Sequence, residues 1–118
     1  MATFSQEGFD MTFIAENVMA EAFVVVELGT SEMQCDLPDA TTDTPLGVIQ
    51  AAAATAGLSV PVRVSGVTKV VANGAFSKGD QLAIAATTGR VDTVSGLDSS
   101  FDGGTATAQK PIGLALTA

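Results

Sequence analysis

The stretch from Val60 to Val94 constrains the fold more than any other part of the chain, because it alternates as short strands do. From Val60 to Ala72 most even positions carry small or β-branched residues, whereas Arg63 and Lys69 stand at odd positions. A period of two predicts a strand with one buried face. Gly66 interrupts this run, and a glycine inside a long strand indicates a bulge or a bend.

Two further segments after this strand have the length and composition of strands. Gln81–Ala86 and Arg90–Val94 each hold alternating apolar residues, and Thr88-Gly89 lies between them. Asn73-Gly74 ends the first strand, and both residue types tolerate the positive φ values that tight turns need. The sequence therefore predicts an antiparallel meander of three strands in this region.

Strands are also expected on both sides of the meander. Phe23–Leu28 is rich in β-branched residues, and Met33–Leu37 is its expected hairpin partner. Pro111–Thr117 has the pattern of a closing strand. Between Ile14 and Phe23 the apolar residues fall near helical spacing, which allows one or two helical turns there.

The segment Gly47–Ala56 permits two interpretations. Its alanines favour a helix, whereas Val48-Ile49 and the flanking proline and glycine permit a strand. The start of this segment resembles a stretch near the C-terminus, because Pro45–Ile49 and Pro111–Ala115 both read proline, aliphatic, glycine, aliphatic, aliphatic. This internal similarity favours the strand.

Composition agrees with a fold made of thin, closely packed strands. The chain has 118 residues, which suffices for one domain with one core, and 47% of them are hydrophobic but only 5% aromatic. We therefore expect a mainly β fold, namely a small single-domain antiparallel β-barrel or sandwich with an extended N-terminal arm and little helix. The arm is expected at residues 1–14 and the β-rich domain at residues 15–118, with a long loop at 95–109 whose role stays open.

Charge and hydropathy restrict the partners. The net charge is −8, and residues 1–59 hold nine acidic residues and no lysine or arginine. Such a surface repels phosphate backbones, so nucleic-acid binding is not expected. No apolar run reaches the roughly 18 residues that a membrane span needs, and the N-terminus does not resemble a signal peptide. The single cysteine, Cys35, cannot form an internal disulfide.

The sequence offers few residues for catalysis. Histidine is absent, which removes the commonest general base and metal ligand. Cys35 has no cation nearby in the sequence and is expected to be a small buried apolar residue. Neither an enzyme activity nor a cofactor is therefore predicted.

Acidic residues gather at two places in the sequence. Asp36, Asp39 and Asp43 form one group, and Asp98 and Asp102 form another. Carboxylates of this kind could bind calcium. Neither group matches the calcium-binding loop pattern D-x-[DN]-x-[DN]-G, so solvated loop acids are the favoured interpretation and calcium binding stays open.

Several short motifs run along most of the chain: Gln6-Glu7-Gly8, Phe23–Val26, Gly47–Ile49, Gly66-Val67, Ala72–Ala75, Lys78–Asp80, Thr88–Arg90 and Pro111–Ala115. The order of these motifs resembles that in the capsid decoration, or cement, proteins of tailed bacteriophages. The resemblance implies a β-rich module, often a homotrimer, on the outer surface of the virion. It would bind junctions between major capsid protein subunits and stabilise the head.

The resemblance also implies that the N-terminal arm orders on the capsid, which gives the arm a role. Arg63 and Lys69 are expected on the outward face of the central strand, where they either pair with acids of a neighbouring copy or are solvated. The candidate residues for contacts with the capsid or with another copy are Phe4, Gln6, Glu7, Phe9, Met11, Phe13, Arg63, Lys69 and Phe101.

One alternative stays open, a small β-barrel that binds or carries a ligand, of the lipoyl-like or sugar-binding kind. Val62–Leu82 has the valine content and the Gly-Asp turn of such barrels. Against it, Lys69 and Lys78 lack the motif that surrounds a carrier lysine, and no tryptophan or tyrosine offers a platform for sugars.

Overall fold

The protein is built from β-strands, as its alternating sequence predicts. The computed structural model describes residues 8–40, 43–85, 87–93 and 111–116. Within these ranges there are eight strands and no helix, and hence no helix that could cross a membrane. The strands are β1 Gly8–Ala15, β2 Val25–Leu28, β3 Gln34–Asp36, β4 Gly47–Ile49, β5 Ser59–Gly66, β6 Gln81–Ile84, β7 Val91–Thr93 and β8 Pro111–Leu114.

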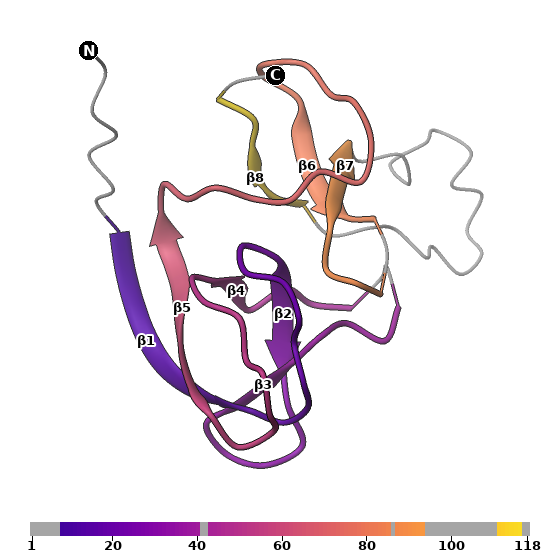
Figure 1. The fold of residues 1–118 in the computed structure, drawn as a ribbon. Helices are drawn as coiled ribbons and strands as arrows, with labels where there is room; N and C mark the ends of the chain where they lie inside the picture. Colours follow the sequence, from indigo (N-terminus) through magenta and orange to yellow (C-terminus); the bar gives the residue numbers. More distant parts are fainter. Residues whose placement is uncertain (1–7, 41–42, 86, 94–110, 117–118) are drawn as a thin grey trace, which may run out of the picture.

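Five of the strands close into a barrel in the order β1-β3-β2-β4-β5 (Figure 1). The longest pairing joins β1 to β5 in antiparallel register, from Gly8 opposite Gly66 to Ile14 opposite Ser59. By contrast, β1 meets β3 in parallel and only through Ile14 and Ala15. Alternate residues of each strand point inward, and the barrel core includes Phe13, Val24, Val26, Cys35, Ile49, Val60 and Val62.

The remaining three strands form a small antiparallel sheet with β6 between β7 and β8. This sheet packs on the outer face of β2, where Val25 is fully buried together with Ile84 and Val91. The backbone also joins the two parts, because the Val25 N–H donates a hydrogen bond of 2.8 Å to the Gly89 carbonyl oxygen. Val26 of β2 therefore packs in the barrel core, while Val25 points outward and anchors the second sheet.

The mainly β prediction and the barrel alternative are confirmed, but the central strand is shorter than its pattern suggests. β5 ends at Gly66, which has a φ of 105°, a value that favours glycine. Beyond Gly66 the chain leaves the barrel and crosses to the second sheet, where the Val91 N–H bonds the Val71 carbonyl at 3.0 Å. The alternation up to Gly66 thus belongs to a barrel strand, whereas residues 67–72 belong to the segment that crosses to the second sheet.

The predicted three-stranded meander is wrong in its first member. β6 and β7 form the expected antiparallel hairpin, but the other neighbour of β6 is β8, from the C-terminal end of the described residues. β5 belongs to the barrel instead, between β1 and β4. Short-range turn signals identified the hairpin, whereas the choice of the third strand depends on contacts far apart in the sequence.

Most of the other predicted strands are confirmed. β2 and β3 form the expected antiparallel hairpin, β8 is the closing strand, and the strand interpretation of Gly47–Ala56 holds over Gly47–Ile49. The helical turns predicted between Ile14 and Phe23 are wrong. Met19 makes an isolated antiparallel bridge to Ala53 instead, and this bridge uses the backbone groups that a helix would need.

The boundary between arm and domain stays a prediction. Residues 1–7 lie outside the described residues, as does the expected loop at 95–109. Residues 8–14, which the sequence assigned to the arm, form most of β1 and pair with β5.

Candidate docking surfaces

The upper part of the β1–β5 ribbon carries apolar side chains that the barrel does not cover. Towards the N-terminus of β1 the inward face becomes exposed. Phe13 is buried, at 5% exposure, whereas Met11 is 37% and Phe9 60% exposed. All three are odd-numbered residues of one strand and so share a face. This face is core at one end of the strand and surface at the other, because the ribbon extends past the barrel (Figure 1).

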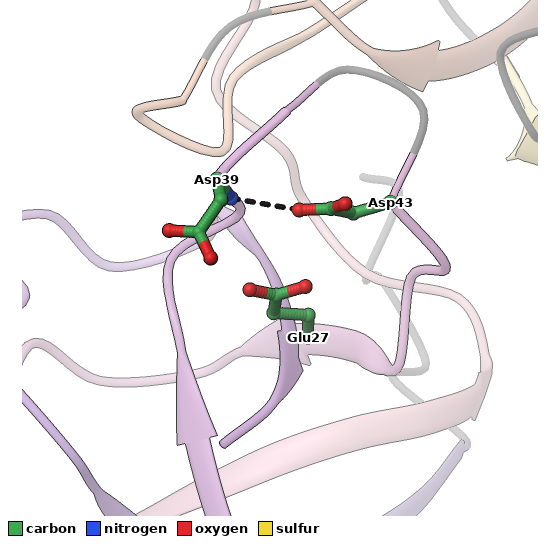
Figure 2. A group of neighbouring side chains, drawn as sticks. All are labelled: Glu27, Asp39 and Asp43. Carbon is green, nitrogen blue, oxygen red and sulfur yellow. Dashed lines mark hydrogen bonds between the residues drawn. The ribbon is translucent and has the colours of Figure 1, made fainter. Parts of the chain in front are cut away.

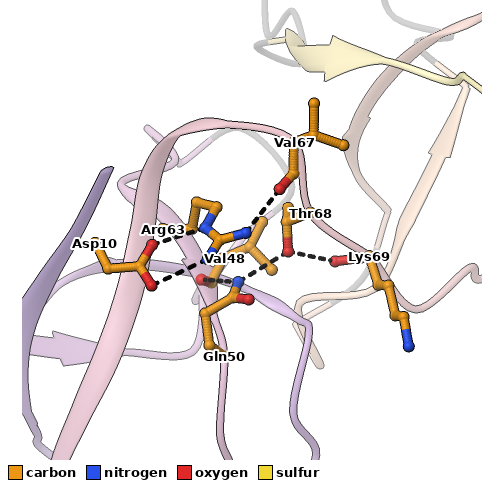
Figure 3. Close-up of polar contacts among 7 residues, drawn as sticks. All are labelled: Asp10, Val48, Gln50, Arg63, Val67, Thr68 and Lys69. Carbon is orange, nitrogen blue, oxygen red and sulfur yellow. Dashed lines mark hydrogen bonds and ion pairs between the residues drawn. The ribbon is translucent and has the colours of Figure 1, made fainter. Parts of the chain in front are cut away.

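An ion pair holds the ribbon at this level (Figure 3). The Arg63 Nε lies 2.7 Å from Asp10 Oδ1 and Nη2 lies 3.1 Å from Oδ2, a two-point contact between β5 and β1. Hydrogen bonding to Arg63 lowers the pKa of the Asp10 carboxyl, and the same contact raises the pKa of the guanidinium. Arg63 is therefore paired within its own chain, which departs from both alternatives given for it above.

Arg63 also fixes the chain that leaves β5. Its Nη1 donates a 2.8 Å hydrogen bond to the Val67 carbonyl oxygen, one residue past the end of the strand. Gln50 supports the same segment by donating to the Val48 carbonyl and, at 2.8 Å, to the Thr68 hydroxyl (Figure 3). These bonds hold the crossing segment against β4 and β5.

An apolar cavity lies between the barrel and the second sheet. Its volume is about 670 Å³, and its lining includes Val48, Val70, Phe76, Leu82, Ile112 and Leu114, with Lys69 as the charged member. The ammonium of the exposed Lys69 lies 5.8 Å from the centre of the Phe23 ring, within the range of a cation–π contact. Lys69 thus combines a partner inside the chain with exposure to solvent.

Three carboxylates gather where β2 meets the loop after β3 (Figure 2). Glu27, Asp39 and Asp43 can place one oxygen each within 4.8 Å of one another. Asp43 Oδ2 accepts hydrogen bonds from the backbone N–H of Asp39 at 2.7 Å and of Ala40 at 3.0 Å. Burial, and then the Asp43 carboxylate, raise the pKa of Glu27 to about 7. Clustered acids of this kind are common without a metal, so the geometry alone defines no metal site.

This cluster differs from the one predicted from the sequence. Asp36 is not part of it, because its carboxylate accepts hydrogen bonds from Asn17 and from the Leu37 N–H. Glu27 takes its place from another strand. The available signal was the position of Glu27 after the buried run Val24–Val26, but its neighbours across the hairpin could not be inferred from spacing.

The structure places only some of the predicted interface residues at the surface. Phe9, Met11 and Lys69 are exposed, whereas Phe13 is part of the barrel core and has no surface for a partner. Four others lie outside the described residues: Phe4, Gln6, Glu7 and Phe101. The expectation for Cys35 is confirmed, because the side chain is fully buried and burial raises the pKa of its thiol to about 11.

These features define a class of protein. Exposed apolar side chains lie on several strands, among them Phe9 and Met11 on β1 and Leu114 on β8. This arrangement is typical of a structural β-protein that binds by its surface. The chain belongs to the phage cement protein family, whose model matches residues 5–118. A search of the curated proteins and a search of the solved structures found no match.

Membership of this family confirms the resemblance that the motifs suggested. A phage cement protein is a structural component associated with the capsid, and the family is not a class of enzymes. The role of the chain is accordingly to stabilise the capsid.

Proposed function

We propose that this protein binds the outer surface of the phage head at junctions between major capsid protein subunits. The observation that carries the proposal is the family match over residues 5–118. The exposed apolar residues of β1 support it, because Phe9 at 60% and Met11 at 37% exposure share one face of the strand and offer an apolar contact to a partner. Many copies on one shell would add avidity to modest single contacts.

The proposal is tested with purified protein and undecorated heads. Co-sedimentation should show saturable binding, and decorated heads should withstand heating or osmotic shock better than bare heads. Electron microscopy of the decorated particles should place extra density outside the shell, over boundaries between subunits. Density over the centre of a single subunit, or none at all, would contradict the proposed position.

We further propose that the functional unit is a homotrimer. Closed cyclic symmetry is the usual form of small homo-oligomers, and a trimer would match a threefold junction of a shell. Light scattering in solution and the symmetry of the bound density measure this directly. A trimer in either state supports the proposal, and a monomer or dimer in both states contradicts it.

The N-terminal arm is proposed to make part of the capsid contact. Because β1 begins at Gly8, deletion of residues 2–7 removes Phe4, Gln6 and Glu7 without taking a residue from the barrel. The shortened chain should keep its circular dichroism spectrum and bind heads more weakly. Binding at the original affinity would contradict a role for the arm.

The cavity between the barrel and the second sheet gives some support to a second function, the binding of a small apolar ligand. Its size and aliphatic lining suit such a ligand. Native mass spectrometry of protein purified from infected cells would show an added mass if the cavity is used. A spectrum containing only the unmodified chain would exclude this candidate.

A further inference from the structure

We propose that the open edge of β1, formed by the backbone of Asp10 and Thr12, is where an extended segment of the shell protein adds as a strand. The inference rests on the proposed function and specifies the contact that would perform it. Strand addition uses main-chain hydrogen bonds for affinity and alternate side chains for specificity. Three observations support it: the direction of the backbone groups, the side chains beside them, and the surrounding charge.

The first observation concerns the two sides of β1. Among the described residues, one side is paired with a strand over most of its length and the other only at its C-terminal end. On one side β5 pairs with every residue from Gly8 to Ile14. On the other side β3 pairs only with Ile14 and Ala15. Among the described residues nothing continues that pairing above Ile14, and Figure 1 shows β1 at the margin of the molecule.

The hydrogen bonds identify which residues point to the free side. The Ile14 N–H donates to the Met33 carbonyl oxygen at 2.7 Å, on the side of β3. The register with β5 is regular from Asp10 to Ile14. Backbone groups alternate along such a strand, so those of Thr12 and Asp10 point the same way. Pro61 gives an independent check of this direction. It lies opposite Thr12 and has no N–H, so the two residues cannot exchange the hydrogen bonds of a bonded pair. The backbone groups of Thr12 therefore point away from β5.

The second observation is that this edge carries an exposed apolar pair. Phe9 and Met11 lie on one face of the open strand, and an added strand would set its own side chains beside them. Proteins usually cover or blunt a free edge of this kind because it invites pairing with other chains. An apolar edge that none of the described residues covers is therefore expected to be covered in the assembly.

The third observation, charge, selects the occupant. Residues 1–59 contain nine acids and no lysine or arginine, so β1, β3 and the turn before β3 carry no positive side chain. Arg63, on β5, is already paired with Asp10. A second copy of the chain would bring the same acidic residues 1–59 and a net charge of −8 on the whole chain, so the two copies would repel each other. A strand that carries lysine or arginine beside apolar residues fits this edge better, which favours the shell protein over another copy.

Thr12 offers the sharpest test, because its N–H points to the free side and is not needed by the barrel. Thr12→Pro removes that donor and places a ring on the edge, a position where strands tolerate proline. Thr12→Lys adds a positive charge where a basic strand should dock, and Thr12→Glu and Thr12→Val are the matched controls. Thermal unfolding of each variant checks the fold, and Thr12→Lys carries the test if the proline variant does not fold.

Co-sedimentation with undecorated heads gives the main result. Thr12→Pro and Thr12→Lys should bind about tenfold more weakly or worse, since one or two hydrogen bonds and a favourable charge contact are lost. Thr12→Val and Thr12→Glu should stay within about threefold of the unchanged chain. Hydrogen exchange at single-residue resolution should show the amides of Asp10 and Thr12 fast in the free protein and slow on the head.

The alternative outcomes separate the two proposals. If the unchanged chain does not bind heads, the proposed function fails. If it binds and all four variants bind equally, the edge is not used and only this inference is overturned. If Thr12→Pro instead converts an oligomer in solution into monomers, the occupant is a second copy, and the assignment to the shell protein is wrong.

Discussion

Gly89 connects the second sheet to the barrel, and its replacement by alanine tests how closely the two parts fit. The residue has a φ of 81°, and an added Cβ would meet the Val25 carbonyl oxygen and lie 3.0 Å from the Cβ of Val24. Both neighbours belong to the chain at the start of β2. Neither is the flexible end of a side chain, so neither can move without disturbing the barrel.

The expected cost follows from two contributions. A positive φ costs an alanine about 1–2 kcal/mol, and the more restricted unfolded state of alanine offsets about 0.4–1 kcal/mol of that. The clash with backbone atoms adds about 1–3 kcal/mol. Gly89→Ala should therefore lower the free energy of unfolding by about 2–4 kcal/mol, a large part of the roughly 5–15 kcal/mol that stabilises a typical domain.

Gly57 provides the matched control. Its φ of 90° is similar to that of Gly89, but a Cβ there would meet nothing within 4 Å. Gly57→Ala should cost only the conformational part, about 1 kcal/mol. Urea unfolding should be followed by circular dichroism, because the chain has no tryptophan or tyrosine for fluorescence. Equal losses in the two variants would refute the close fit between Gly89 and β2.

Three further predictions concern ionisable groups. The pKa of Glu27 in the folded protein is raised from 4.5 to about 7, so the stability present below pH 4.5 is lost as pH rises to about 7 and the loss is complete above it; Glu27→Gln should be more stable than the unchanged chain by about 1–3 kcal/mol at pH 8 and equal to it near pH 4, as measured by urea unfolding. The pKa of Asp10 is lowered by Arg63, so the stability that it contributes is present above its ordinary pKa of 3.8 and lost as pH falls through the lowered value; Asp10→Asn should be less stable than the unchanged chain at pH 6, and the difference should shrink towards pH 2. The buried Cys35 thiol, with a pKa of about 11, should react with iodoacetamide at least about a hundredfold more slowly in the native protein than in urea. Stability losses from Glu27→Gln at pH 8, pH-independent effects of Asp10→Asn, or rapid alkylation of the native thiol would contradict these respective assignments.

Local sequence signals were sufficient for most of the strands. The β2–β3 and β6–β7 hairpins were predicted because their strands and turns are neighbours in the sequence. The similarity between Pro45–Ile49 and Pro111–Ala115 also predicted correctly, since both stretches contribute a short strand. In each case the residues that decide the structure lie within a few positions of one another.

The predictions failed where contacts between residues far apart in the sequence determine the structure. The alternation after Gly66 looked like a continuing strand, but Arg63 bonds the Val67 carbonyl and the chain turns towards the second sheet. Phe13 was a candidate contact residue, because nothing near it in the sequence shows that its side chain packs in the barrel core. Glu27 was missed for the same reason, since Asp39 and Asp43 reach it only after the hairpin folds.

The net charge of the chain and the open edge of β1 together explain how copies of a cement protein could avoid associating with one another before they bind the capsid. An open strand bordered by Phe9 and Met11 would favour association of free copies. The acids around it, and the net charge of −8, oppose that association because every copy repels the next. A basic strand on the shell would remove the repulsion and gain the hydrogen bonds together. On this argument raising the salt concentration should weaken binding to heads and promote self-association, two opposite effects of the same screening.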